Sequence, residues 1–339
     1  MSTNNKNELI GRDVSIDAAR GVALFLVVLS HAHHLPYYMT SFYIIAFFFL
    51  SGWLYKPGKK YTLNIRNKTK RVLIPYFVNS AILLFAFSAI NGFSPDFINT
   101  ALIGIFYSRN VIETGTSPIM ISGNAPLWYL TSFFTTIMLF HILVDRYTRD
   151  VKTVVLIILI LITASILLSK TPILLPWSLE MVPFFTIIMI LAFYLKKQGF
   201  QLSLSWTVTG IIIIFYCVLC SETGSLNLSI RNYGWGGQIP ALLIGLTGTI
   251  ATISLCYKNT IAPLQWFFIG IGTNSITVLS FHLLFFTIYG ALCKRIISFL
   301  HFEISGLPYD LIIVLLSIFS CIALGIFTEI VRMRISRRS

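Results

Sequence analysis

Ten long apolar stretches follow one another along the chain, and most approach the roughly 17 to 25 residues that a helix needs to cross a bilayer. Of the 339 residues, 56% are hydrophobic and only 11% are charged, which is unlike a soluble domain. The sequence therefore predicts an all-α, polytopic integral membrane protein. We expect about ten transmembrane helices, near residues 17–35, 38–55, 72–91, 125–144, 151–169, 181–195, 205–220, 237–257, 266–290 and 309–331.

The Lys and Arg residues fall mainly on one side of this arrangement. With the N-terminus inside, the inner segments hold twenty of the 25 basic residues and the outer segments hold five. Because cytoplasmic loops carry the excess of basic residues, both termini are expected in the cytoplasm, including a polar tail at 1–11. Membrane insertion and anionic lipid account for the net charge of +13, so nucleic-acid binding is not expected.

The first apolar stretch carries two polar residues at a helical spacing. Arg20 lies near its start and His31 near its other end, with no charged residue between them. Eleven residues at about 100° each make close to three turns, so both side chains point the same way, roughly 16 Å apart along the axis. Asp17, one turn before Arg20, is expected to pair with the guanidinium group.

Two other segments hold polar residues beside or within apolar stretches. In the longest inner loop, KPGKKYTLNIRNKTKRVLIPYF, Lys68 and Arg71 lie one helical turn apart. This loop is either a positive-inside anchor or a clamp for a polyphosphate. In the ninth stretch, Ser275 and His282 are seven residues apart and share a helix face. Each membrane histidine, His31 or His282, is either a helix–helix hydrogen-bonding residue or a catalytic one.

Packing and the outer loop give further expectations. Ser51 and Gly52 end the second stretch and are small enough for another helix to approach closely. The largest outer segment, 92–124, is punctuated by Gly and Pro and is expected to fold against the membrane over an acceptor site. The sequence assigns no role to Glu113 in this segment or to Glu180 at the head of the sixth stretch.

These residues and motifs resemble the acyltransferase-3 family of membrane O-acyltransferases. The resemblance rests on Arg20 followed after ten residues by His31, on FFFLSGW at 47–53, on the basic run leading into IPYF, on LWYL at 127–130 and on GTNSITVLSFH at 272–282. It covers nearly the whole chain, so residues 1–339 are expected to form a single membrane domain. Within the family, the chain most resembles the fucose-acetylase-like enzymes that modify bacterial surface sugars.

The resemblance implies an O-acetyltransferase in the inner membrane that uses cytoplasmic acetyl-CoA and no metal. The acceptor would be a saccharide hydroxyl at or beyond the outer side. No hydrolase-like extracytoplasmic domain is recognisable, which favours a lipid-linked or nascent surface polysaccharide. The paired arginines of the family correspond here to Lys68 and Arg71, so the first is substituted. Lys supplies a point charge where Arg would supply a planar fork.

Acyl transfer to a hydroxyl needs a base that ionises near neutral pH, and histidine suits that role. We therefore predict His31 as a catalytic residue, either general base or acyl carrier, and His282 as a second one. Arg20, Lys68 and Arg71 are predicted to bind the phosphates of coenzyme A. The alternative is a lipid-linked sugar flippase, a polymerase or a secondary transporter, in which membrane His and Arg residues would line a transport path. The sequence does not specify the oligomeric state.

Overall fold

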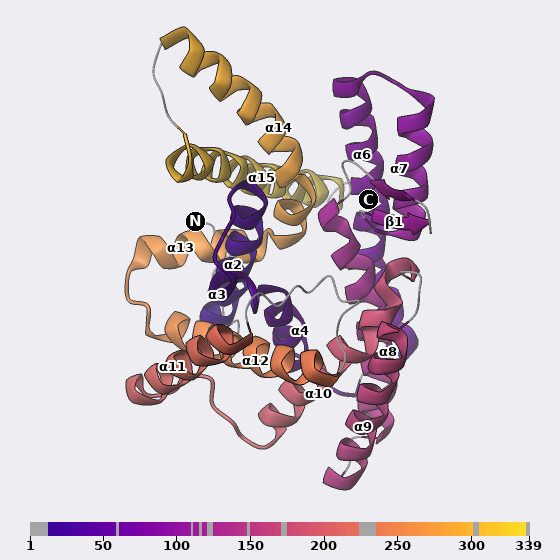
Figure 1. Ribbon diagram of the computed structural model, residues 1–339, viewed down its shortest axis with the longest axis vertical. Coiled ribbons are helices and arrows are strands. Elements are labelled where there is room, and N and C mark those ends of the chain that lie inside the picture. Colours follow the sequence, from indigo (N-terminus) through magenta and orange to yellow (C-terminus); the bar gives the residue numbers. More distant parts are fainter. Residues whose placement is uncertain are drawn as a thin grey trace.

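The computed structural model describes residues 13–58, 61–109, 111–114, 117–120, 125–147, 150–170, 175–223, 235–300 and 305–336. Helices make up nearly all of it (Figure 1). In chain order they are α2 (Val14–Ala32), α3 (Tyr37–Thr40), α4 (Tyr43–Trp53), α5 (Tyr61–Lys68), α6 (Ile74–Asn91), α7 (Pro95–Tyr107), α8 (Trp128–Tyr147), α9 (Val151–Ser169), α10 (Val182–Lys197), α11 (Trp206–Thr223), α12 (Trp235–Lys258), α13 (Ala262–Thr273), α14 (Ser275–Leu300) and α15 (Leu307–Ser336).

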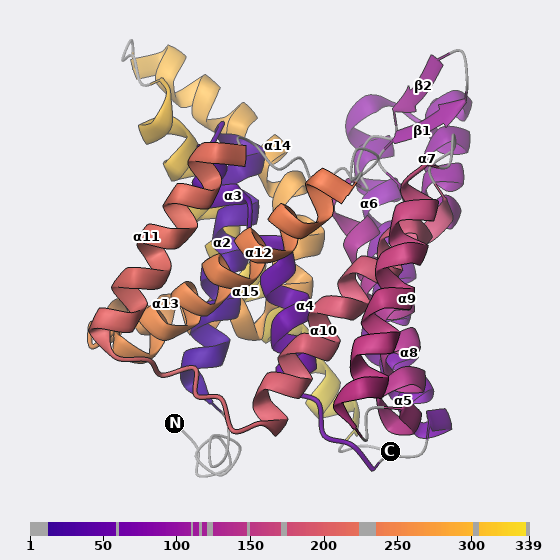
Figure 2. The ribbon, with the colours of Figure 1, turned by 60° about the horizontal axis from the view of Figure 1, so that its bottom comes forward.

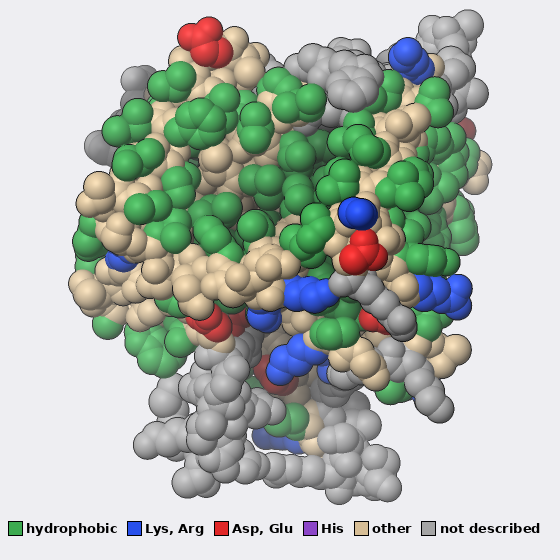
Figure 3. Space-filling model, turned by 90° about the horizontal axis from the view of Figure 1, so that it is seen from below, with side chains coloured by type: hydrophobic (Ala, Val, Ile, Leu, Met, Phe, Trp, Pro, Cys, Tyr) green, Lys and Arg blue, Asp and Glu red, His purple; other side chains and the backbone are tan. Residues whose placement is uncertain are grey.

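Nine helices within these ranges are long and apolar enough to cross a membrane. This confirms the prediction of an all-α, polytopic membrane protein, and α9 begins and ends at the residues predicted for the fifth stretch. Apolar side chains cover much of the face shown in Figure 3, and Lys and Arg side chains gather along its lower border. Such a border is expected where a bilayer meets the cytoplasm.

The second predicted span is shorter in the structure than the sequence indicates. It is divided into α3 and α4, and α4 has only 11 residues. The hydroxyl of Ser41 donates to the carbonyl of Tyr37 at 2.6 Å, a local bond of the kind that competes with helix propagation. Most of α4 is buried, so protein and not lipid surrounds it, and it does not need the full length of a span.

The ninth predicted span is broken at Asn274 into α13 and α14. The Asn274 side-chain amide donates to the carbonyl of Gly270 at 2.9 Å, and this bond to the preceding turn closes α13. The break places Ser275 at the first position of α14.

The predicted basic inner loop is largely helical. After α5, a π-helical turn, η1 (Thr69–Leu73), leads directly into α6. Pro75 has no N–H to donate to the carbonyl of Arg71 four residues earlier, and its ring would clash there in a regular α-helix. The amide of Ile74 instead reaches back five residues to Thr69, which widens the turn that carries Arg71.

A small antiparallel hairpin lies at the opposite end of the molecule from α5 (Figure 2). It pairs β1 (Val111–Thr114) with β2 (Ser117–Met120), and Ile112 lies opposite Ile119. Helix α7 and this hairpin make up most of the described part of the predicted outer segment 92–124. That this segment covers an acceptor site stays a prediction. Glu113 lies in β1, and its side chain is outside the described part of the chain.

Helix α2 lies in the centre of the fold, packed against α4, α12, α13, α14 and α15 (Figure 1). Glycines bring the backbones together. A Cβ added at Gly272 would lie 2.1 Å from the backbone oxygen of Asp17, and one at Gly21 would lie 1.9 Å from that of Phe268. At Gly52 it would lie 2.2 Å from the oxygen of Met189 in α10, which confirms the predicted close approach there.

The substitution Gly272→Ala is expected to destabilise the protein, because its methyl group would meet backbone that moves only if α2 and α13 separate. Overpacking of this kind costs about 1 to 3 kcal/mol. Thermal unfolding of detergent-purified protein should show a lower midpoint, with less monodisperse material. Gly210→Ala in α11 is the control, since its methyl group would meet no atom within 4 Å. Equal midpoints for the two variants would contradict the packing described here.

Candidate functional site

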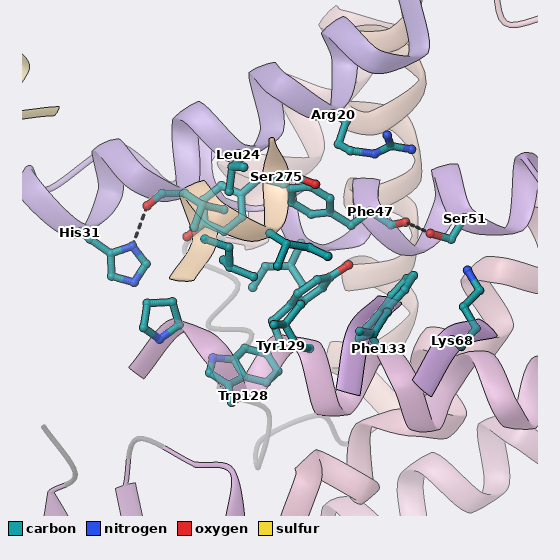
Figure 4. Close-up of a pocket in the computed structure, with 18 residues that line it drawn as sticks. Arg20, Leu24, His31, Phe47, Ser51, Lys68, Trp128, Tyr129, Phe133 and Ser275 are labelled. Carbon is teal, nitrogen blue, oxygen red and sulfur yellow. Dashed lines mark hydrogen bonds between the residues drawn. The ribbon is translucent and has the colours of Figure 1, made fainter. Parts of the chain in front are cut away.

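A cavity of about 340 Å³ lies between α2, α4, α8 and α14 (Figure 4). We call it the central cavity. Arg20 and Lys68 lie at one end and His31 lies at the other. The walls between these ends are mainly apolar and aromatic, formed by Leu24, Val27, Ile44, Phe47, Tyr129, Phe133 and Leu279. The cavity can therefore take a long ligand with an anionic end and an uncharged arm.

A second hollow of about 350 Å³ adjoins the charged end of the central cavity, and we call it the basic basin. Arg20, Ser51 and Lys68 line both hollows, so the two meet at these residues. The basin also receives Lys56 and Arg71. Its remaining lining comes from Leu54, Tyr55, Asn64, Asn67, Ile137 and His141.

The predicted ion pair between Asp17 and Arg20 is confirmed. Nη1 of Arg20 donates to Oδ1 of Asp17 at 3.0 Å, and the carboxylate is buried. A guanidinium group has five N–H donors, so this contact leaves others for an anion in the cavity. Asp17 thus orients Arg20 on the face of α2 that also carries His31.

The two membrane histidines lie side by side, with ring centroids 5.1 Å apart. Nδ1 of His31 is 2.7 Å from the carbonyl of Val27, and Nδ1 of His282 is 2.9 Å from that of Val278. Because a carbonyl only accepts, each Nδ1 carries the proton, and each Nε2 keeps its lone pair. His31 is exposed into the central cavity, whereas His282 is buried behind it.

Nε2 of His282 has no hydrogen-bond partner among the described residues. On the same helix, the Ser280 hydroxyl accepts from the amide of Asn79 at 2.8 Å, and this bond joins α14 to α6. The structure therefore brings His31 and His282 together, as a pair in which one ring is accessible and the other is buried.

Lys68 and Arg71 come to the same place as Arg20. Lys68 lies over the ring of Phe133, with Nζ 5.8 Å from the centroid, and lines both hollows. Arg71 is exposed and lines the basic basin only. Of the five predicted site residues, four line the joined hollows and His282 lies just behind them. Their functional roles stay predictions.

Glu180, whose role the sequence left open, lies away from both hollows in a buried ion pair with Arg109. Nε of Arg109 also donates to the carbonyl of Leu175 at 3.2 Å, and Nε1 of Trp177 donates to that of Phe106 at 2.9 Å. These contacts fasten the 3₁₀ segment η3 (Pro176–Met181) to the end of α7. We therefore assign Glu180 to the architecture of this end of the molecule.

Sequence reasoning missed His141, which lines the basic basin from α8. The available signal was the same as for His31, a histidine inside an apolar stretch, with the polar residue Asp145 one helical turn later. Groups of three or more His, Cys, Asp or Glu side chains suited to a metal ion are absent from the described ranges.

A comparison with protein families matches the acyltransferase-3 model, described as an acyltransferase domain, to residues 13–326. The matched range includes every residue that lines the central cavity and the basic basin. Comparisons with curated proteins and with solved structures gave no match.

Proposed function

Because the chain belongs to the acyltransferase-3 family and is a multi-pass membrane acyltransferase, we propose that it transfers acetyl groups from cytoplasmic acetyl-CoA to a saccharide hydroxyl. The observation that carries this proposal is the continuous hollow that leads from a cluster of Lys and Arg side chains to His31. A donor with phosphates at one end and a reactive thioester at the other fits that arrangement.

The donor would lie with its phosphates among Arg20, Lys68 and Arg71, where charge-assisted hydrogen bonds are strongest. Its pantetheine arm would follow the apolar walls of the central cavity. The eleven-residue rise of α2 from Arg20 to His31 spans roughly 16 Å, which an extended pantetheine arm can cover. The thioester would thus arrive beside the imidazole.

His31 would act as the general base. Its Nε2 takes the proton of the acceptor hydroxyl while the hydroxyl oxygen attacks the carbonyl carbon of the thioester. The new C–O bond forms, the C–S bond breaks, and the thiolate of coenzyme A takes the proton from the imidazolium. His282, 5.1 Å away between centroids, offers a second lone pair beside the charge that forms on His31.

The acceptor would approach His31 from the end of the cavity where Trp128 lies (Figure 4). Aromatic rings with an apolar face suit the C–H face of a sugar. The resemblance to fucose-acetylase-like enzymes supports a lipid-linked or nascent bacterial surface polysaccharide as the acceptor. In this proposal the protein lies in the inner membrane with both termini in the cytoplasm, as the distribution of basic residues indicates.

Membrane vesicles of defined orientation test the proposal. Inside-out vesicles given acetyl-labelled acetyl-CoA should release free coenzyme A and place an equal amount of label, as a base-labile ester, on saccharide. Right-side-out vesicles given the same external donor should give no label. An intact thioester in both preparations would favour the flippase, polymerase or transporter and reject the proposal.

A further inference from the structure

His141 is a buried histidine in the basic basin that the proposed chemistry does not use. Its side chain is 2% exposed, and neither ring nitrogen has a hydrogen-bond partner among the described residues. Most buried polar side-chain atoms in folded proteins are hydrogen-bonded, and leaving them unpaired costs free energy. His141 thus lines the basic basin with two ring nitrogens that no described protein group pairs with.

The ring of His141 is held in place by its neighbours. The ring of Tyr55 lies 4.7 Å from it between centroids, and the hydroxyl of Tyr55 donates to the carboxylate of Asp145 at 2.5 Å. Phe140 packs against Tyr55 with ring centroids 5.1 Å apart. Because Tyr55 is fixed at both its ring and its hydroxyl, it acts as a positioning residue for His141.

The lining of the basic basin divides into two kinds of side chain. Arg20, Lys56, Lys68 and Arg71 supply only donors and positive charge, which suits phosphate oxygens. A neutral imidazole offers one donor and one acceptor, and an amide such as that of Asn67 offers both as well. Phosphate has no donor for those acceptors, whereas the edge of a purine presents donors and acceptors together.

We propose that the basic basin contains a nucleobase subsite, in which His141, together with Asn67, binds the adenine edge of the donor nucleotide. This inference rests on the proposed function, because it extends the donor site from the phosphates to the base. It assigns to His141 a role in donor recognition that is separate from the chemistry at His31.

Truncation of the donor separates this role from a structural one. Binding of labelled coenzyme A and of labelled 4′-phosphopantetheine, which lacks the nucleoside, should be measured on the purified full chain. We expect His141→Ala to weaken coenzyme A binding about tenfold. Binding of 4′-phosphopantetheine should not change. His141→Gln should recover part of the loss, since its amide again offers a donor and an acceptor.

His34→Ala is the matched control, because His34 is exposed and lines neither hollow. Equal weakening of both ligands in His141→Ala would show a structural role and overturn the inference, as would unchanged coenzyme A binding. Either result leaves the proposed function standing if vesicles still transfer acetyl groups. If wild-type vesicles transferred no acetyl groups while His141→Ala selectively weakened coenzyme A binding, the proposed function alone would be rejected. If the wild-type protein bound no coenzyme A, both the proposed function and this inference would be rejected.

Discussion

Replacing His31 with alanine should lower the rate of acetyl transfer by about a hundredfold to ten-thousandfold, the usual contribution of a general base. The reason is geometric: Nδ1 of His31 is committed to the carbonyl of Val27, which leaves Nε2 as the base that faces the cavity. Donor binding should be unaffected, because the proposed phosphate contacts lie at the other end of α2. The measurement is acetyl ester formed per enzyme, alongside the affinity for coenzyme A.

The companion variant His282→Ala should be less severe, since the ring of His282 is buried behind His31 and does not line the cavity. His34→Ala should transfer acetyl groups at the wild-type rate. If His31→Ala retained wild-type product while His282→Ala lost it, the catalytic helix would be α14. In that case α2 would contribute only a wall of the donor site.

Helix positions were predictable from the sequence for α9 and α11, two helices that expose apolar side chains along much of their length. The helix α9 shows this best, because its apolar run ends at charged or polar residues on both sides and has exposed apolar faces. The same reasoning gave α4 too great a length, since apolar composition does not distinguish a helix surrounded by protein from one surrounded by lipid. The break at Asn274 depends on one side-chain bond that a hydropathy window averages out.

The donor side of the candidate site was predictable in part. The spacing of Arg20 and His31 specified a shared helix face, and the structure places both on the wall of one cavity. The approach of α5 and the π-helical turn to Arg20 was predicted only through the family resemblance, because no spacing along the chain encodes this tertiary packing. The pairing of Arg109 with Glu180 joins residues 71 positions apart, which no local pattern encodes.

Replacing Arg71 with alanine should weaken coenzyme A binding about tenfold to a hundredfold, since a charge-assisted contact contributes about 1.5 to 3 kcal/mol. Arg20→Ala should give a loss of similar size. Arg71→Lys should fall between wild type and Arg71→Ala, because it keeps the charge and loses the planar fork. The affinity is measured by equilibrium binding to monodisperse protein, without an acceptor.

Arg66→Ala is the matched control for the Arg71 series. Arg66 is an exposed arginine on α5, one turn or so before Arg71, yet it lines neither the basic basin nor the central cavity. If Arg71 acted only through a general electrostatic attraction, coenzyme A binding would weaken similarly in Arg66→Ala and Arg71→Ala. If Arg71 makes a specific phosphate contact, only Arg71→Ala weakens binding. Wild-type affinity in both Arg20→Ala and Arg71→Ala would show that the donor phosphates do not bind in the basic basin, and the thioester would then have to reach His31 by another route.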